Sequence, residues 1–416
     1  MARQTRQNSA QGAKVNEKGL GSFSAFYSHI MNRRGMAARP STGKHIARSS
    51  VYIPQLIPAV LLVAYGAVVI YSASLSIAEA SFPRHLLGIA MGLVGAFLIW
   101  RYDYRTLQNM TTALLVTDVI LMFLPKVPGL SYTALGMTGW IKIPIIGMTF
   151  QPSELAKLVT IYLMAGLGAQ YNGKIDTLRD YLKLCGFLCV PFLLILTQPD
   201  LGTGLIILVT GAAIIICAGA KRSWVLVTIG GIVALGALVV VMSMTPGMPH
   251  PLKQYQLNRL IVFADPSVDP AGDGYNLQQA KIAVGSGGLL GKGIGHATQA
   301  GSGFLPEAHT DFVFALLAEE FGFVGSVLLL ALFGGLIFST IILANKIESP
   351  FGKLVLVGCA TMWSFQLLQN VGMCIGIMPI TGIPLPFVSF GSSSMLVQIT
   401  AVGMVQSVWH HKLKAG

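Results

Sequence analysis

The sequence has 416 residues, of which 53% are hydrophobic and only 11% charged, and its formal net charge is +12. Soluble globular proteins contain about a quarter charged residues, so this composition excludes a chain of soluble domains. Apolar stretches recur along almost the whole length, and a stretch of about twenty residues crosses roughly 30 Å of hydrocarbon as a helix. The composition therefore predicts an all-α polytopic membrane protein.

Residues 1–51 form a basic arm ahead of the first apolar stretch. They contain nine Lys and Arg residues and a single acid, Glu17. Such an arm could bind nucleic acid. Beside a membrane span it favours a disordered cytoplasmic segment that contacts anionic membrane lipids, so we expect no nucleic-acid partner. No short apolar region with a small-residue cleavage site precedes the first span, and we expect no cleaved signal peptide.

The hydrophobic pattern predicts a ten-transmembrane-helix bundle over residues 52–410. The spans are expected at about 52–73, 83–101, 106–125, 153–171, 182–198, 201–219, 223–243, 312–344, 352–375 and 385–409. With the N-terminus inside, the inner segments carry 20 Lys and Arg residues and the outer segments carry 7. Because basic residues stay on the cytoplasmic side, we expect both termini to be cytoplasmic, including a short tail at 411–416.

This topology turns most of the polar connecting segments toward the outer face. They are 126–152, 197–202, 376–386 and a 68-residue loop at 244–311, between spans 7 and 8. The last is too long for a simple connector, and long loops in compact proteins are usually functional. We expect this large extracytoplasmic loop to be functional or partly helical.

Ionisable residues from distant parts of the chain share the outer membrane level. Asp311 lies at the outer end of the eighth span, and Asp200 in "QPDLG" lies at the same side. Glu154 and Lys157, in the outer third of the fourth span, are three residues apart and share one helical face. That pair could simply lock helix packing. Because intramembrane ionisable residues are costly and normally face protein or water, their coincidence with Asp311 favours an outward-facing polar cavity.

Two kinds of chemistry suit such a cavity. A carboxylate beside a cation can take a proton from a sugar hydroxyl while the cation steadies a phosphate leaving group. Buried acids also serve proton-coupled transport. Serine hydrolysis is disfavoured because no G-x-S-x-G elbow is present. The segment "GSGGLLGKGIG" (285–295) lacks the Ser or Thr that follows the lysine of a P-loop, and we expect a close-packed turn there.

Five segments resemble the SEDS family of cell-wall proteins, which includes RodA and FtsW. They are "GWIKIPIIGMTFQPSELAKL", "TQPDLGTG", "YQLNRLIVFADPSVDPAGDGYNLQQAKIAVGSGGLLGKG", "FLPEAHTDFVFALLAEEFG" and "GIMPITGIPLPFVSFGSSS". The resemblance covers residues 52–410 in order, and its wording is closer to RodA than to FtsW. It implies a ten-helix bundle in the bacterial cytoplasmic membrane that polymerises lipid II into glycan strands at the outer face. It also implies a class B penicillin-binding protein as partner.

The resemblance further implies the roles of three residues. Asp311, which follows "HT", would be the base that deprotonates the acceptor's GlcNAc 4-hydroxyl for attack on C1 of the donor's MurNAc. Undecaprenyl pyrophosphate would leave, and the anomeric centre would invert. Lys157 would offset pyrophosphate charge, and Glu154 would hold Lys157 or help place a divalent cation, Mg or Mn. No other cofactor is implied.

Five more residues are candidates for substrate binding. The guanidinium fork of Arg259 matches pyrophosphate geometrically. The ring of Trp140 could lie against a sugar or lipid, or simply belong to an interfacial tryptophan belt. Ser389, Asp200 and His309 complete the set, although His309 and Asp311 could instead share a metal.

Two positions depart from the family pattern. Gly139 stands where a basic residue usually precedes the loop tryptophan, and Lys142 could substitute for it. Ser392 replaces the second glycine of the last motif. These departures concern substrate handling rather than the reaction class.

Three functions remain open at this point: a glycosyltransferase, a flippase or transporter of the lipid-linked precursor, and a scaffold without chemistry. A flippase predicts polar groups through the whole membrane depth. Here they concentrate at the outer side, apart from Glu319 and Glu320 about 12 Å further along the eighth span, which favours the enzyme. The sequence does not separate a role in elongation from one in division.

Overall fold

The computed structural model describes residues 50–413 except for 135–136, 144–147, 199, 246, 250 and 253. The predicted basic arm therefore lies outside the described residues, apart from residues 50 and 51. Residues 411–413, expected in a tail, continue the last helix, and 414–416 lie outside the described residues.

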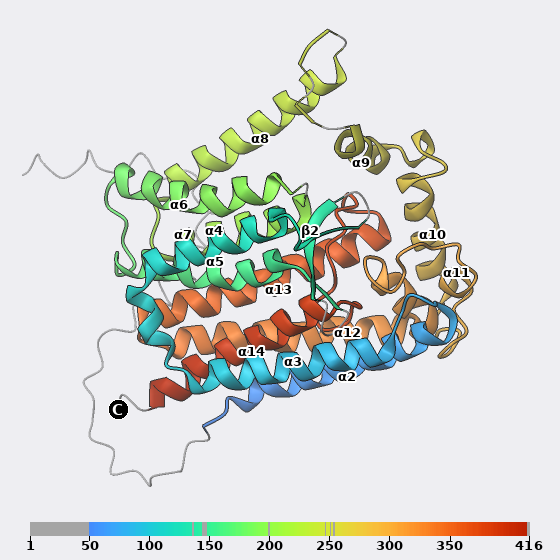
Figure 1. Cartoon of the computed structure of the whole chain (residues 1–416), viewed down its shortest axis with the longest axis horizontal. Helices are drawn as coiled ribbons and strands as arrows, with labels where there is room; N and C mark the ends of the chain where they lie inside the picture. Colours follow the sequence, from blue (N-terminus) through green and yellow to red (C-terminus); the bar gives the residue numbers. More distant parts are fainter. Residues whose placement is uncertain are drawn as a thin grey trace, which may run out of the picture. The chain divides into compact units, whose positions relative to one another are not determined.

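Helices make up most of the described chain (Figure 1). They are α2 Ile53–Ser76, α3 Phe82–Arg101, α4 Thr111–Phe123, α5 Pro152–Ala169, α6 Leu178–Leu196, α7 Leu201–Cys217, α8 Arg222–Met244, α9 Gln254–Ala264, α10 Asp273–Ser286, α11 Thr298–Gly301, α12 Val313–Lys346, α13 Pro350–Ile375 and α14 Ser392–Leu413. Three 3-10 helices, η1 Tyr104–Asn109, η2 Leu124–Lys126 and η3 Pro266–Val268, lie between them.

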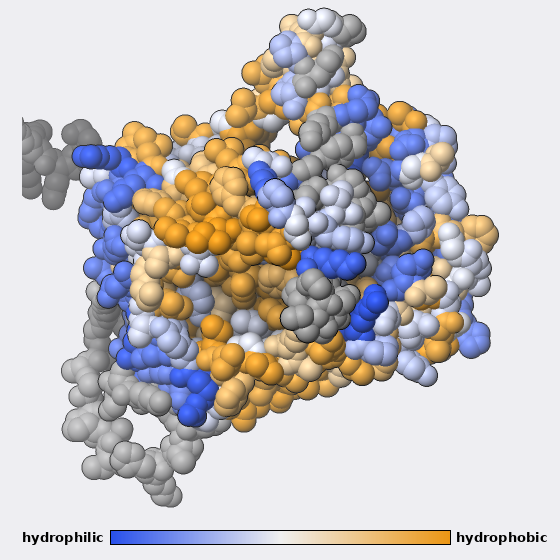
Figure 2. Space-filling view, in the orientation of Figure 1, coloured by the Kyte–Doolittle hydropathy of each residue, from blue (hydrophilic) through white to orange (hydrophobic). Residues whose placement is uncertain are grey.

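Each predicted span overlaps one of the helices α2 to α8 and α12 to α14. Among the described residues, five helices are long and apolar enough to cross a membrane, namely α2, α3, α8, α12 and α13. Figure 2 shows a broad hydrophobic band over the helices, with hydrophilic residues toward both ends. The chain is therefore a multi-pass membrane protein, and the count of ten crossings stays a prediction.

The expectation of an all-α fold is wrong for one segment. Residues 131–150 form an antiparallel sheet of three strands in the order β1-β2-β3, with β1 at Ser131–Ala134, β2 at Met137–Ile143 and β3 at Met148–Phe150. Aromatic and β-branched residues in "MTGWIKI" favour a pleated strand over a helix. The sheet lies beside the start of α5 in Figure 1 and brings polar side chains there.

The expected last span also begins too early. Residues 385–391 are not helical, and α14 starts only at Ser392. Pro384 and Pro386 cannot supply backbone donors to a helix, and Phe387 has a left-handed φ of 64°. This non-helical stretch, 385–391, runs past the start of α12, where Phe390 N–H donates to the His309 carbonyl (2.8 Å).

Helix α12 is broken at Gly322, which has φ 65° and ψ −161°. The glycine-rich segment 285–295 packs across the break as the close-packed turn that the sequence predicts. Its Lys292 N–H donates to the Glu319 carbonyl (2.9 Å), and its Gly288 carbonyl accepts from Phe323 N–H (2.8 Å). A Cβ added at Gly287 would lie only 1.9 Å from the Ala318 oxygen, so this close approach requires glycine. The turn thus satisfies backbone groups that the break releases.

The break changes the expected position of Glu319 and Glu320. Glu319 Oε1 accepts from Lys292 Nζ (2.5 Å) and from the Thr298 backbone N–H (2.9 Å). Glu320 Oε1 accepts from the Ser72 hydroxyl at 2.6 Å, close to the end of α2. Both carboxylates therefore lie against the 285–299 segment at the same end of the bundle as Asp311, rather than deep along a straight helix. We call this end the Asp311 end.

Helix α5 occupies the interior, and α8 does not. α5 is buried along almost its whole length and packs against α4, α7 and α13. α8 diverges from the other helices in Figure 1, and its Val227 is 75% exposed. Near its start, the Tyr181 hydroxyl of α6 donates to the Thr228 hydroxyl (2.8 Å), and the Tyr181 ring lies 5.7 Å from the Trp224 ring. The buried α5 is the element that places the Glu154–Lys157 pair.

Candidate active site

A hydrogen bond to the backbone carbonyl of Asp311 holds this residue in place. Its carbonyl accepts from the Asn370 side-chain amide of α13 at 2.7 Å, and the same amide donates to the Ile383 carbonyl at 2.8 Å. Asn370 therefore ties the start of α12 to the 376–386 loop. A Cβ added at Gly382, which has φ +67°, would lie 3.1 Å from Asp311 Oδ2. The loop backbone thus approaches the carboxylate closely.

Burial and neighbouring charges tune the Asp311 carboxyl. The pKa of Asp311 is raised from 3.8 to about 6; burial is the largest cause, the charges of Glu307 and Asp200 also raise it, and Arg259 lowers it. Burial disfavours the charged form, and like charges add to that effect. A carboxyl with this pKa is mostly ionised near neutral pH but is a stronger base than an exposed aspartate.

Glu307 shapes the turn that carries Asp311. It has a left-handed φ of 53°, which is rare for a residue with a side chain. Its carbonyl accepts from the N–H groups of Thr310 (3.2 Å), Asp311 (3.0 Å) and Phe312 (3.1 Å), and its Oε2 accepts from the Thr310 hydroxyl (2.6 Å). Strained residues of this kind persist where the surroundings fix them, often at functional sites.

Ser389 and His309 also lie at this turn. The Ser389 hydroxyl donates to the Thr310 carbonyl (2.6 Å) and accepts from Leu385 N–H (2.8 Å), and the residue is 2% exposed. These contacts engage Ser389 with backbone groups beside Asp311. The His309 ring packs against Phe390 at 5.5 Å between centroids, and burial lowers its pKa.

The ion pair predicted between Glu154 and Lys157 forms. Lys157 Nζ lies 2.7 Å from Glu154 Oε1, and both residues are almost fully buried in the first turns of α5. Glu154 Oε2 has no hydrogen-bond partner among the described residues. Burying such a pair costs desolvation free energy, so a pair of this kind is kept where the charges serve a function or fix the helix packing.

Asp200 connects the starts of three helices. Its Oδ1 accepts from Thr203 N–H (2.9 Å) and caps α7, while its Oδ2 accepts from the Gln151 side-chain amide (3.0 Å) just before α5. The Gln151 N–H in turn donates to Ser393 Oγ (3.0 Å) in α14. Burial raises the Asp200 pKa, the Thr203 hydrogen bonds lower it, and the charge of Glu154 raises it. Asp200 acts electrostatically on Asp311 as well, so it links the α5 pair to the Asp311 turn.

The two remaining predicted substrate-binding residues are Arg259 and Trp140. Arg259, in α9, lies 3.6 Å from Asp273 Oδ2 in α10 and is close enough to Asp311 to lower its pKa. Trp140 lies in β2 opposite Tyr132 and is half-buried. Within the described part of the chain, no hydrogen bond or ring contact joins the Trp140 side chain to the carboxylates.

The carboxylates do not form a ready-made metal centre. Among the described residues there is no group of three or more His, Cys, Asp or Glu side chains that could hold an ion together. Asp200 is used as a helix cap and Glu154 is bonded to Lys157. These residues do not fit a divalent cation as arranged.

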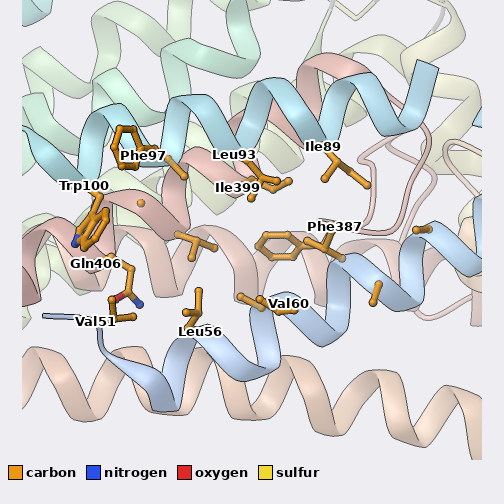
Figure 3. Close-up of a pocket in the computed structure, with 17 residues that line it drawn as sticks. Val51, Leu56, Val60, Ile89, Leu93, Phe97, Trp100, Phe387, Ile399 and Gln406 are labelled. Carbon is orange, nitrogen blue, oxygen red and sulfur yellow. The ribbon is translucent and has the colours of Figure 1, made fainter. Parts of the chain in front are cut away.

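An apolar groove of about 460 Å³ lies between α2, α3 and α14 (Figure 3). Its walls include Val60 of α2, Leu93 and Phe97 of α3, and Ile399 of α14, and Gln406 is the one amide among its lining side chains. Phe387 also lines the groove, and it precedes Ser389 by two residues. Val60, Leu93 and Phe97 are each more than half exposed. The groove is thus open on its side and leads toward the Asp311 turn.

Sequence reasoning did not identify Asn370 or Gln151, and it left Glu307 without a role. Asn370 had a usable signal, because a polar residue in the apolar stretch of α13 is costly unless it is bonded. Gln151 lies directly before the "PSE" motif and could have been assigned with it. The position of Glu307 depends on a left-handed φ, and no residue pattern in this segment predicts that conformation.

Comparisons with known proteins agree with this fold over almost the whole described region. A family model described as "Cell cycle protein", for FtsW, RodA and SpoVE, matches residues 54–414. Stage V sporulation protein E of Bacillus subtilis is 34% identical over 84% of this chain and 94% of its own length. Peptidoglycan glycosyltransferase MrdB of Escherichia coli is 35% identical over 84% of this chain and 91% of its own. Such similar identities do not separate the branches, so the preference for RodA stays a prediction.

Solved structures extend the similarity to three dimensions. RodA of Thermus thermophilus, a rod shape determining protein, is 27% identical with a TM-score of 0.63, and the match covers 87% of this chain and 97% of that one. A chain from a peptidoglycan synthase complex, described for its coordination of polymerization and crosslinking, is 28% identical with a TM-score of 0.72 over 87% and 98%. The chain therefore belongs to the FtsW, RodA and SpoVE family of cell cycle proteins.

Proposed function

We propose that Asp311 is the general base of a lipid II polymerase. The chain is a peptidoglycan glycosyltransferase, as its relatives MrdB and FtsW are named. Two properties of the Asp311 carboxyl support its role as the base: the residue is partly exposed, and its pKa is about 6. A base with a pKa just below the working pH combines ionisation with proton affinity.

In the proposed reaction the acceptor's GlcNAc 4-hydroxyl gives its proton to the Asp311 carboxylate. The resulting oxygen nucleophile bonds to C1 of the donor's MurNAc, and the bond from C1 to the pyrophosphate oxygen breaks. Undecaprenyl pyrophosphate leaves with the electron pair. Attack opposite to the leaving group inverts the anomeric centre.

Glu154 and Lys157 support this reaction from a distance. The Lys157 ammonium is buried and bonded to Glu154, so it acts through its field rather than by touching substrate. The pair faces Asp200, whose carboxylate in turn acts on Asp311. The charge of Arg259 lowers the pKa of Asp311, and its guanidinium suits a role in binding phosphate.

The apolar groove suits the polyprenyl chain of the substrate. Its walls are almost entirely hydrocarbon and open toward the hydrophobic band. The Asp311 end then faces the outer surface, with ten crossings and both termini in the cytoplasm, as the Lys and Arg asymmetry predicts. A class B penicillin-binding protein is the proposed partner, because a structural neighbour comes from a complex that couples polymerization to crosslinking.

Purified full-length chain incubated with lipid II tests this proposal. We expect glycan strands from the wild type and at least a hundredfold slower formation with Asp311→Asn, since general bases contribute about 10²–10⁴-fold. Wild-type rates in the variant would exclude Asp311 as the base. A flippase would instead move lipid II across liposome membranes without forming strands, and a scaffold would do neither.

A further inference from the structure

A second cavity, of about 370 Å³, lies where the three-stranded sheet meets the starts of α3 and α14. Its lining includes Arg84 at the start of α3, Lys142 and Thr149 of the sheet, and Gly391 and Ser392 at the start of α14. None of these residues belongs to the Asp311 machinery described above. We call this cavity the cationic pocket.

Two positive charges converge on the cationic pocket. Arg84 and Lys142 are exposed, and neither side chain forms an ion pair or hydrogen bond with another described residue. No acidic residue is among the lining side chains. Like charges that meet without a counter-charge repel each other, and an anion between them removes that repulsion. The pocket therefore has the charge pattern of an anion site.

The walls of the pocket are fixed by contacts with one another. Lys142 pairs with Thr149 in the β2–β3 ladder. The Ser393 hydroxyl donates to the Thr149 carbonyl (3.4 Å), and the Ser392 hydroxyl donates to the Arg84 carbonyl (3.5 Å). These bonds join the sheet, α3 and α14. The first amides of α14, a helix of 22 residues, add unpaired N–H groups beside the two cations.

The cationic pocket and the apolar groove are bordered by the same two segments, α3 and 387–392. Helix α3 contributes Arg84 to the pocket and Ile89 to the groove, and five residues of helix rise about 7.5 Å. The 387–392 segment borders both spaces, with Phe387 in the groove and Ser392 in the pocket. Between them, Ser389 bonds to Thr310, next to Asp311. A hydrocarbon chain in the groove would thus carry its head group into the cationic pocket, beside the proposed base.

We propose that the cationic pocket binds the pyrophosphate of a polyprenyl-linked substrate, with Arg84 and Lys142 as its two charged ligands. The site deepens the proposed function and rests on it for the choice of a lipid-linked pyrophosphate. Arg84 offers a planar fork and Lys142 a compact point charge. Arg259 and Lys157, the cations that the sequence suggested for this task, already have carboxylate partners in Asp273 and Glu154.

Direct binding to the full-length protein in detergent tests the proposal. The probes are undecaprenyl pyrophosphate, undecaprenol, which lacks phosphate, and inorganic pyrophosphate, which lacks the chain. We expect Arg84→Ala and Lys142→Ala each to weaken binding of undecaprenyl pyrophosphate about tenfold, the worth of one charge-assisted bond. Lys142→Arg should retain most of the affinity. Undecaprenol should bind more weakly and equally to all variants.

Lys281→Ala is the matched control, because Lys281 is also exposed but lies on α10, outside the pocket. It should bind undecaprenyl pyrophosphate like the wild type, and thermal unfolding should be unchanged in every variant. Equal affinity of wild type and the Arg84→Ala/Lys142→Ala double variant would overturn the assignment. Tight binding of inorganic pyrophosphate with no gain from the chain would overturn the lipid-linked part.

The binding readout separates this inference from the proposed function. If the wild type polymerises lipid II but the pocket variants bind undecaprenyl pyrophosphate normally, the pocket assignment fails and the polymerase stands. If the wild type forms no strands but the binding pattern is as expected, the polymerase proposal fails and the anion site stands. In the expected case, the pocket variants also show a raised KM for lipid II with a smaller change in kcat.

Discussion

Glu307 lies four residues before Asp311, and its negative charge raises the pKa of the Asp311 carboxyl. Glu307→Gln removes that charge, while the new amide oxygen can still accept from the Thr310 hydroxyl, which bonds Glu307 Oε2 at 2.6 Å. The pKa of Asp311 should therefore fall. Because a general base acts in its ionised form, the acid side of the pH–rate profile should move to lower pH.

The size of the effect follows from the Asp311 pKa. A rise from 3.8 to about 6 corresponds to about 3 kcal/mol. Burial is its largest cause and Glu307 the second, so removing the Glu307 charge should reverse part of this rise. A full unit of decrease in the midpoint would leave about half of the carboxyls ionised at pH 5 instead of about a tenth. The rate at pH 5, relative to the plateau, should therefore rise by up to about fivefold.

Initial rates of lipid II polymerisation across the pH range measure this shift. Arg259→Met is the opposing variant, because Arg259 lowers the Asp311 pKa and its loss should move the midpoint to higher pH. Asp273→Asn keeps the guanidinium and removes its 3.6 Å partner, so it controls for the lost ion pair. An unmoved midpoint in Glu307→Gln, or shifts of both charge variants in one direction, would refute the reasoning.

Three further outcomes are expected. Lys157→Met leaves the Glu154 carboxylate buried without the cation that lies 2.7 Å away, so the free energy of unfolding in denaturant titrations should drop by about 3 kcal/mol. Adding Glu154→Gln to that variant should restore most of the lost stability. An unchanged free energy of unfolding in Lys157→Met would contradict the buried ion pair. Gly382→Ala places a Cβ 3.1 Å from Asp311 Oδ2 at a position with φ +67°, so kcat, measured well below the melting temperature, should fall about tenfold, and the melting temperature should fall too because the left-handed backbone disfavours a side chain. An unaffected kcat would mean that the loop does not position the base. Ala64→Phe obstructs the groove and should raise the KM for lipid II about tenfold, the worth of about two displaced methylenes, whereas a short-chain analogue should show no such change.

The sequence was sufficient to place the helices and the main carboxylates. Apolar stretches predicted where the helices α2 to α8 and α12 to α14 lie, although α14 begins seven residues later than expected, because an unbonded backbone is costly in hydrocarbon and a helix avoids that cost. The i, i+3 spacing of Glu154 and Lys157 predicted their contact, since those positions share a helix face. Asp311 was a candidate because an ionisable residue at the end of a membrane span is costly unless it has a partner or a function.

The remaining features depend on tertiary contacts that no local pattern carries. The break at Gly322 is stabilised by a turn about thirty residues earlier in the chain, through bonds such as Lys292 N–H to the Glu319 carbonyl. Asn370 acquires its role only when α13 meets both the Asp311 turn and the 376–386 loop. The cationic pocket needs Arg84 and Lys142 to meet across 58 residues of sequence.

The open side of the apolar groove bears on how a processive enzyme could exchange its substrates. Val60, Leu93 and Phe97 face outward from the bundle along the groove. A lipid anchor held there can enter and depart sideways within the plane of the bilayer, without threading through a closed channel and without separation of α2 from α3. Under that arrangement, spent carrier lipid and the next precursor trade places by lateral diffusion, and strand growth depends on carrier supply in the surrounding leaflet.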